Sequence, residues 1–185
     1  MTEKYFDELR YSEIKVDNQI TLRQLMLDEA DQLYRLVDNN REYLKEWLPW
    51  VEGTQGSEDS KKFISETLEK REDGNEYGYG IFVDGKLEGH TSLMHIRDGG
   101  EPEIGCWIDE TMSGQGISTK VGQALTEFGF NILGFERMII KADPENRKSI
   151  SIAKKLGYKE IRRQHVGIGI TNVYSLNKSE YNRAK

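Results

Sequence analysis

Two glycines at positions 114 and 116 lie in the stretch MSGQGISTK (112–120), where their spacing suggests contact with a phosphate. A glycine has no Cβ atom, so a ligand can approach the main-chain N–H groups closely. These N–H groups, together with the positive end of a following helix, favour a phosphate or pyrophosphate. The same pair would also serve an ordinary turn between a strand and a helix, and the glycines alone leave both interpretations open.

Two common nucleotide-binding loops can be excluded at this position. A P-loop needs a Gly-Lys pair followed by Ser or Thr, and no Gly-Lys pair in the chain has such a neighbour. The Rossmann fingerprint needs a third glycine three residues after Gly116, where the chain has Thr119. A phosphate-binding role for this stretch therefore requires another kind of loop.

The flanking pattern predicts a strand before the glycines (101–109) and a helix after them (118–133). Asp84-Gly85 predicts a hairpin turn between two further strands. The whole order is strand, three helices, three antiparallel strands, helix, strand, helix, two strands. This order predicts a mixed α/β domain with one central, mostly antiparallel, seven-stranded sheet flanked by helices. We divide the chain into a polar leader (1–18), one domain (19–178) and a tail (179–185).

Composition excludes several classes of protein. The chain has 185 residues and a formal net charge of −6 without a basic block, which disfavours a nucleic-acid partner. No apolar stretch approaches the ~20 residues that span a bilayer, and the N-terminus lacks a signal-peptide layout. The single cysteine, Cys106, fits a reducing compartment, and three scattered histidines disfavour a metal site. We therefore expect a cytoplasmic protein with no metal, nucleic acid or membrane partner.

Four segments carry a family resemblance. MSGQGISTKVGQALTEFGF resembles the acetyl-coenzyme A loop and helix of the GNAT N-acetyltransferase superfamily, and ADPENRKSISIAKKLGYKE resembles its second signature. REYLKEWLPWVEG and EIGCWID resemble segments of the RimJ/RimL branch, which acetylates N-termini of ribosomal proteins. Within this branch, the chain most resembles the bacillary YdaF-like members. The resemblance covers roughly residues 19–177. It departs from the loop pattern [RQ]-x-x-G-x-[GA] at Ser113 and Ser118.

The resemblance implies a single-domain acyltransferase fold whose strands four and five, 101–109 and 136–142, splay apart. The pantetheine arm of acetyl-CoA would fill the splay as a false strand, and one backbone amide there would face the oxyanion. The residues implied to bind acetyl-CoA are Trp107, Ile108, Asp109, Ser113, Gly114, Gln115, Gly116, Ile117, Ser118 and Asn146.

Acetyl transfer to an amine needs a neutral amine, a stabilised oxyanion and a proton for the thiolate. Many members of the superfamily donate this proton from a tyrosine at the position of Ala153, and the resemblance implies Ser149 as the acid instead. Ser149 could also serve only local hydrogen bonds, and Asn146 only as a helix cap. We consider Glu103 first and His165 second as the base, since the glutamate that RimL-like enzymes carry beyond the second signature is missing.

The sequence says least about the amine that accepts the acetyl group. The resemblance implies a protein N-terminus of the ribosomal-protein-serine type, with a small amine (polyamine, amino acid or aminoglycoside) or a non-catalytic acyl-CoA-binding module as alternatives. Trp47 and Trp50, in WLPW, would line the acceptor channel, form a subunit contact or simply pack on the sheet. A homodimer or higher homo-oligomer is left open.

Overall fold

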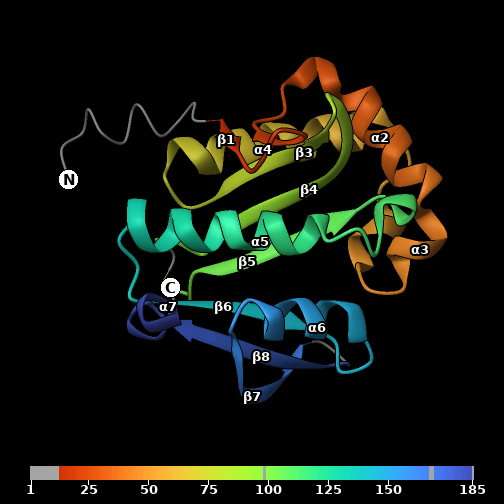
Figure 1. Cartoon of the computed structure of the whole chain (residues 1–185). Coiled ribbons are helices and arrows are strands. Elements are labelled where there is room, and N and C mark those ends of the chain that lie inside the picture. The colour runs from red at the N-terminus through yellow and green to blue at the C-terminus, as the bar shows by residue number, and fades with distance from the viewer. Residues whose placement is uncertain (1–12, 98, 167–168, 185) are drawn as a thin grey trace.

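The computed structural model describes residues 13–97, 99–166 and 169–184, and it forms one sheet flanked by helices (Figure 1). The strand order is β1-β2-β3-β4-β5-β6-β8-β7. The strands are β1 (Ile14–Lys15), β2 (Ile20–Arg23), β3 (Tyr77–Val83), β4 (Lys86–Met94), β5 (Glu103–Ile108), β6 (Arg137–Ala142), β7 (Lys159–Val166) and β8 (Gly169–Asn177).

The helices fall where the apolar periodicity places them, with α7 as an addition. The α-helices are α2 (Ala30–Asn39), α3 (Arg41–Lys45), α4 (Ser57–Glu72), α5 (Ile117–Glu127), α6 (Arg147–Lys155) and α7 (Lys178–Ala184). The short turns of helix are η1 (Leu27–Glu29), η2 (Pro49–Gly53), η3 (Glu110–Met112) and the π-helical η4 (Phe128–Ile132). None of the helices in the described part of the chain has the length and apolar character needed to cross a membrane.

The sheet has eight strands and not seven, because Ile14 and Lys15 pair with Leu22 and Thr21 of β2. These two residues belong to the segment that the sequence assigned to a polar leader, whose residues 1–12 lie outside the described part. At the other end, α7 occupies most of the segment assigned to a tail. Both additions are short. A strand of two residues, such as β1, is too short to show the alternation of apolar and polar residues by which a strand is predicted.

The two faces of the sheet bury separate apolar clusters. Alternate residues of a strand point to opposite faces, so Ile81 packs with Val121 and Leu125 of α5 while Phe82 packs with Leu33 of α2 and Ile64 of α4. The sheet is therefore covered by α5 on one face and by α2 and α4 on the other. The predicted hairpin turn is present, with φ of +49° at Asp84 and +82° at Gly85.

The sheet opens between β5 and β6, its parallel pair. These strands pair at Glu103 and Ile139, where Ile139 N donates to Pro102 O at 2.8 Å. Beyond this point the two strands carry no further ladder pair, up to Ile108 and Ala142. The predicted splay between the fourth and fifth strands of the fold is thus confirmed, with the closed end at Glu103 and the open end at Ile108.

Candidate active site

The glycine loop lies between β5 and α5 and leaves the start of α5 open. Gly114 and Gly116 have φ of +83° and +81°, in the left-handed region that favours glycine, and no atom of the described residues lies within 4 Å of a Cβ built at either position. Gly116 is the N-cap of α5, and in the described part of the chain no side chain caps this helix. The first N–H groups of α5 therefore keep their hydrogen-bonding capacity for another partner.

Side-chain hydrogen bonds fix the loop from the end of β5. The carboxylate of Asp109 accepts from Thr111 N at 2.8 Å and from the Thr111 hydroxyl, and Gln115 Nε2 donates to Thr111 O at 2.9 Å. Burial would raise the pKa of Asp109, but the hydrogen bonds from Thr111 and Asn40 outweigh it and lower the pKa. Asp109 is therefore an ionised cap that holds the loop in place.

One main-chain amide at the end of β5 faces the open side of the sheet. Asp109 N donates to Glu88 O of β4 at 2.6 Å. Because successive amides of a strand point in opposite directions, the amide of Ile108 is directed away from β4. Of the three backbone positions suggested by the resemblance, Ile108 is the one whose N–H can reach a ligand lying between β5 and β6.

Helix α6 supplies two polar groups near the end of β6. Asn146 is its N-cap, with Oδ1 accepting from Ser149 N at 3.0 Å, so Asn146 does cap the helix and keeps Nδ2 as a donor. Among the described residues, none makes a hydrogen bond with the half-buried hydroxyl of Ser149. Ala153 is fully buried against the sheet. Ser149 is thus a free hydroxyl on this helix.

The structure brings neither base candidate to the end of β5. Glu103 lies at the closed end of the splay, where its carboxylate forms an ion pair with Lys141 Nζ at 2.6 Å and is 13% exposed. Ile108 lies five positions further along the chain, a distance of roughly 16 Å along a strand. His165 is exposed on β7, the edge strand, with β8 between it and β6.

Aromatic residues form a wall beside the end of β5. Trp50 is 44% exposed, and its ring centroid lies 6.0 Å from that of Trp107. Trp107 packs on a buried cluster of Val37, Leu44 and Val51 from α2, α3 and η2. Trp47 is half-buried. The α3–η2 segment therefore both packs on the sheet and leaves one tryptophan ring accessible.

Two features of this region were missed from the sequence. Asn40 is buried and its Nδ2 donates to Asp109 Oδ2 at 2.8 Å, and Lys148 Nζ of α6 lies 5.1 Å from the ring centroid of Tyr43 of α3. The second contact connects helices on the two sides of the splay. An asparagine between two helical segments signals a cap, but nothing in the sequence signals its partner.

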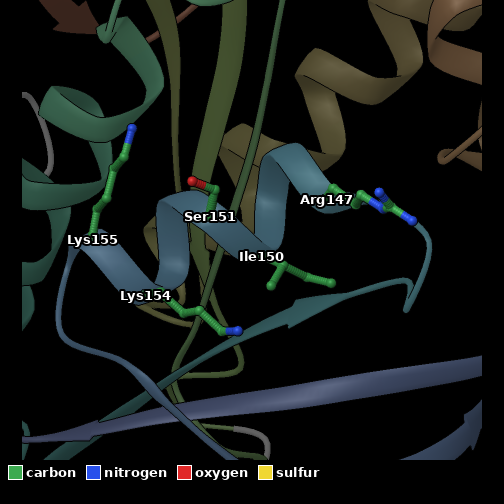
Figure 2. Close-up of a pocket in the computed structure, with 5 residues that line it drawn as sticks. All are labelled: Arg147, Ile150, Ser151, Lys154 and Lys155. Carbon is green, nitrogen blue, oxygen red and sulfur yellow. The ribbon is translucent and has the colours of Figure 1, made fainter.

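A shallow hollow of about 480 Å³ lies along one side of α6 (Figure 2). Its lining residues recur at the spacing of one helical face: Arg147, Ile150, Ser151, Lys154 and Lys155. Figure 2 shows Arg147 at the start of the helix and Lys155 at its end. Within the described ranges no acidic group pairs with the three cations of this hollow, although the chain as a whole is acidic. Such a surface suits phosphate groups.

Known proteins share this architecture. A family model described as acetyltransferase (GNAT) domain matches residues 19–159. YdaF of Bacillus subtilis (strain 168), whose name assigns it provisionally to ribosomal N-acetylation, is 28% identical over 179 residues, 92% of this chain and 98% of YdaF. The ribosomal-protein-serine acetyltransferase of Escherichia coli (strain K12) is 29% identical over 146 residues, 78% of this chain and 82% of that protein.

A solved structure of RimL, the ribosomal L7/L12 alpha-N-protein acetyltransferase, in complex with coenzyme A has the same fold. Its TM-score is 0.84 at 23% identity, over 91% of this chain and 99% of RimL. The family model covers well over half of the chain, including the glycine loop, the splayed strands and α6. The chain therefore belongs to the GNAT acetyltransferase family and is an enzyme that uses acetyl-CoA as its co-substrate.

Proposed function

We propose that this enzyme transfers the acetyl group to the α-amine of a protein N-terminus, with a ribosomal protein as the acceptor. The observation that carries the proposal is the placement of the Ile108 amide at the open end of the splay, in a chain related to a ribosomal-protein-serine acetyltransferase. Serine at the first position of the acceptor is part of the proposal. So is a cytoplasmic location, in keeping with the single cysteine.

The proposed transfer step assigns roles to the Ile108 amide and the Ser149 hydroxyl. The neutral amine attacks the thioester carbonyl carbon, and the resulting oxyanion accepts a hydrogen bond from Ile108 N–H. The tetrahedral intermediate then collapses with cleavage of the C–S bond, and the Ser149 hydroxyl donates a proton to the departing thiolate. The acylated nitrogen loses one proton, and water carries this proton to the serine oxygen, so that the serine hydroxyl is restored. Products are the acetylated amine and the free thiol of CoA.

The carboxylate next to Ile108, that of Asp109, already accepts hydrogen bonds from Thr111 and Asn40, and this favours an α-amine over a lysine side chain. An α-amine with a pKa of about 7.8 costs roughly 1 kcal/mol to deprotonate at neutral pH, whereas a lysine at about 10.4 costs roughly 4.6 kcal/mol. Neither Glu103 nor His165 lies where it would offset the larger cost. An enzyme that relies on water as the base therefore works best on the more acidic amine.

This preference is testable with an amine panel. We expect a thiol-release assay to give the highest kcat/KM with peptides that begin with serine and have a free α-amine. The rate of acetylation should rise with pH through the pKa of the α-amine, about 8. The same peptides with a blocked N-terminus and one internal lysine, together with spermidine and an aminoglycoside, complete the panel. A blocked lysine peptide or a small amine that outperforms the free N-terminus at neutral pH would contradict the proposed acceptor.

The hollow on α6 is proposed to hold phosphate groups of acetyl-CoA, which yields a second expectation. Replacing both Lys154 and Lys155 with methionine should raise the Kd of acetyl-CoA about 10-fold at low salt, because exposed charge pairs contribute up to about 1 kcal/mol each. The increase should shrink at high salt as the charges are screened. Isothermal titration calorimetry measures both values.

The adjacent Lys61 and Lys62 on α4 provide the matched control. These two lysines are exposed and lie on the helix that covers the face of the sheet opposite α5. Their methionine variants should leave the Kd of acetyl-CoA unchanged. Equal effects of the two double substitutions would mean that only net charge matters and that α6 holds no phosphate.

A further inference from the structure

A buried asparagine at the corner between α2 and α3 reaches the end of β5. Asn40 is 5% exposed, and its Nδ2 donates to Leu36 O and to Asp109 Oδ2, each at 2.8 Å. Its Oδ1 accepts from Glu110 N, also at 2.8 Å. One side chain therefore binds both residues that follow β5, although they are 69 and 70 positions away.

The backbone of Asn40 is fixed as firmly as its side chain. Asn40 N donates to Val37 O at 3.1 Å, at the end of α2, and Asn40 O accepts from Leu44 N at 2.8 Å, in α3. A shift of the asparagine would disturb both helix ends. The amide group is consequently a rigid link and not a surface contact that forms and breaks.

This link joins the two halves of the proposed site. Ile108, whose amide faces the splay, directly precedes Asp109. On the other side, Leu44 of α3 belongs to the cluster on which Trp107 packs, next to the exposed Trp50. Asn40 therefore links the end of β5 to the α3–η2 segment that carries Trp50.

We propose that Asn40 is a positioning residue for acetyl transfer: it holds the Ile108 amide and the α3–η2 wall in the relative placement that the attacking amine requires. This inference rests on the proposed function. Asn40 touches neither substrate, so it acts through Asp109 and Glu110. The glycine loop keeps its own anchor, because Asp109 still caps it through Thr111 when the asparagine is lost.

The first test removes the link. We expect Asn40→Ala to lower kcat by about 10- to 100-fold, because a displacement of about 1 Å in a reacting group can cost that much. The Kd of acetyl-CoA, measured by calorimetry, should stay within about threefold of the wild-type value. The substitution removes a contribution to the transition state and leaves the binding of acetyl-CoA in the ground state unchanged. A residue needed only for folding would lower affinity and activity together.

The second test changes the chemistry and keeps the shape. In Asn40→Asp, two carboxylates face each other at positions 40 and 109, and a proton bound between them would restore the link. The charge of Lys86 of β4 helps to lower the pKa of Asp109. Asp38 and Arg41, on either side of Asn40 in the sequence, form an ion pair with each other. The ratio of variant to wild-type kcat should therefore rise as pH falls. A loss of packing alone would give a ratio that does not change with pH.

The third test exchanges the partners. Asp109→Asn added to Asn40→Asp lets the new amide donate to the new carboxylate and still accept from Thr111 N. We expect this double variant to regain about 10-fold of the lost kcat. Wild-type kcat in a folded Asn40→Ala, or no gain in the exchanged pair, would overturn the inference while leaving the proposed function intact. A wild-type chain that acetylates no amine would instead refute the proposed function, and the inference with it.

Discussion

Replacing Ser149 with alanine should lower kcat about 100-fold, at the small end of the range for general acid catalysis because a thiolate is weakly basic. The structure is compatible with this role, since the Ser149 hydroxyl has no hydrogen-bond partner in the described chain and the side chain of Ala153 offers no acid. The cap from Asn146 uses the backbone of Ser149 and survives the substitution. The Kd of acetyl-CoA should therefore change by less than about threefold.

Two variants make the Ser149 result interpretable. Ser149→Thr keeps a hydroxyl at the same half-buried position and should retain most of the activity. Ser65→Ala removes a hydroxyl from α4, which covers the opposite face of the sheet, and should leave kcat unchanged. Rates need to be measured where chemistry limits turnover, by single-turnover kinetics. An unchanged single-turnover rate in Ser149→Ala would show that water protonates the thiolate.

Replacing Gly116 with valine should raise the Kd of acetyl-CoA at least about 100-fold, because a branched Cβ would stand against the phosphates and φ of +81° is strained for valine. For the wild-type chain, acetyl-CoA at 100 times its Kd should stabilise the fold by about 2.7 kcal/mol, seen as a rise in Tm. The variant should show no such rise at the same concentration.

Gly85 provides a control for strain alone. It has φ of +82° in the β3–β4 turn, and, as at Gly116, none of the atoms that the structure describes lies within 4 Å of a Cβ built there. Without ligand, Gly85→Val should lower Tm by about as much as Gly116→Val does. Unlike Gly116→Val, it should still bind acetyl-CoA with the wild-type Kd. Normal binding by Gly116→Val would mean that the loop is only a turn between β5 and α5.

Much of the fold could be predicted because its signals are local. Asp84-Gly85 marks the turn of the β3–β4 hairpin, and apolar residues at helical spacing mark α5 and α6. β1 and α7 carry no such signal. Two residues are too few to show alternation, and α7 has a mixed polar sequence whose helicity depends on docking, for example by Tyr181 against Phe130.

The candidate site was predictable only where it is contiguous in sequence. The glycine loop and the Asn146–Ser149 pair each lie within a few residues, so a pattern could reveal them. Glu103 shows the opposite case: the sequence places it on the correct strand but does not say which end of that strand separates from β6. It lies at the paired end, bound to Lys141. Asn40 depends on partners 69 and 70 residues away and leaves no local trace.

The most direct measurement uses one peptide that offers both kinds of amine. A peptide that begins with serine and contains one internal lysine is incubated with the enzyme and acetyl-CoA at neutral pH, and the position of the acetyl group is mapped by fragmentation mass spectrometry. We expect the acetyl group on the N-terminal serine, because the cost of deprotonating the two amines differs by about 3.5 kcal/mol. Acetylation first at the lysine, or no acetylation at all, would contradict the account.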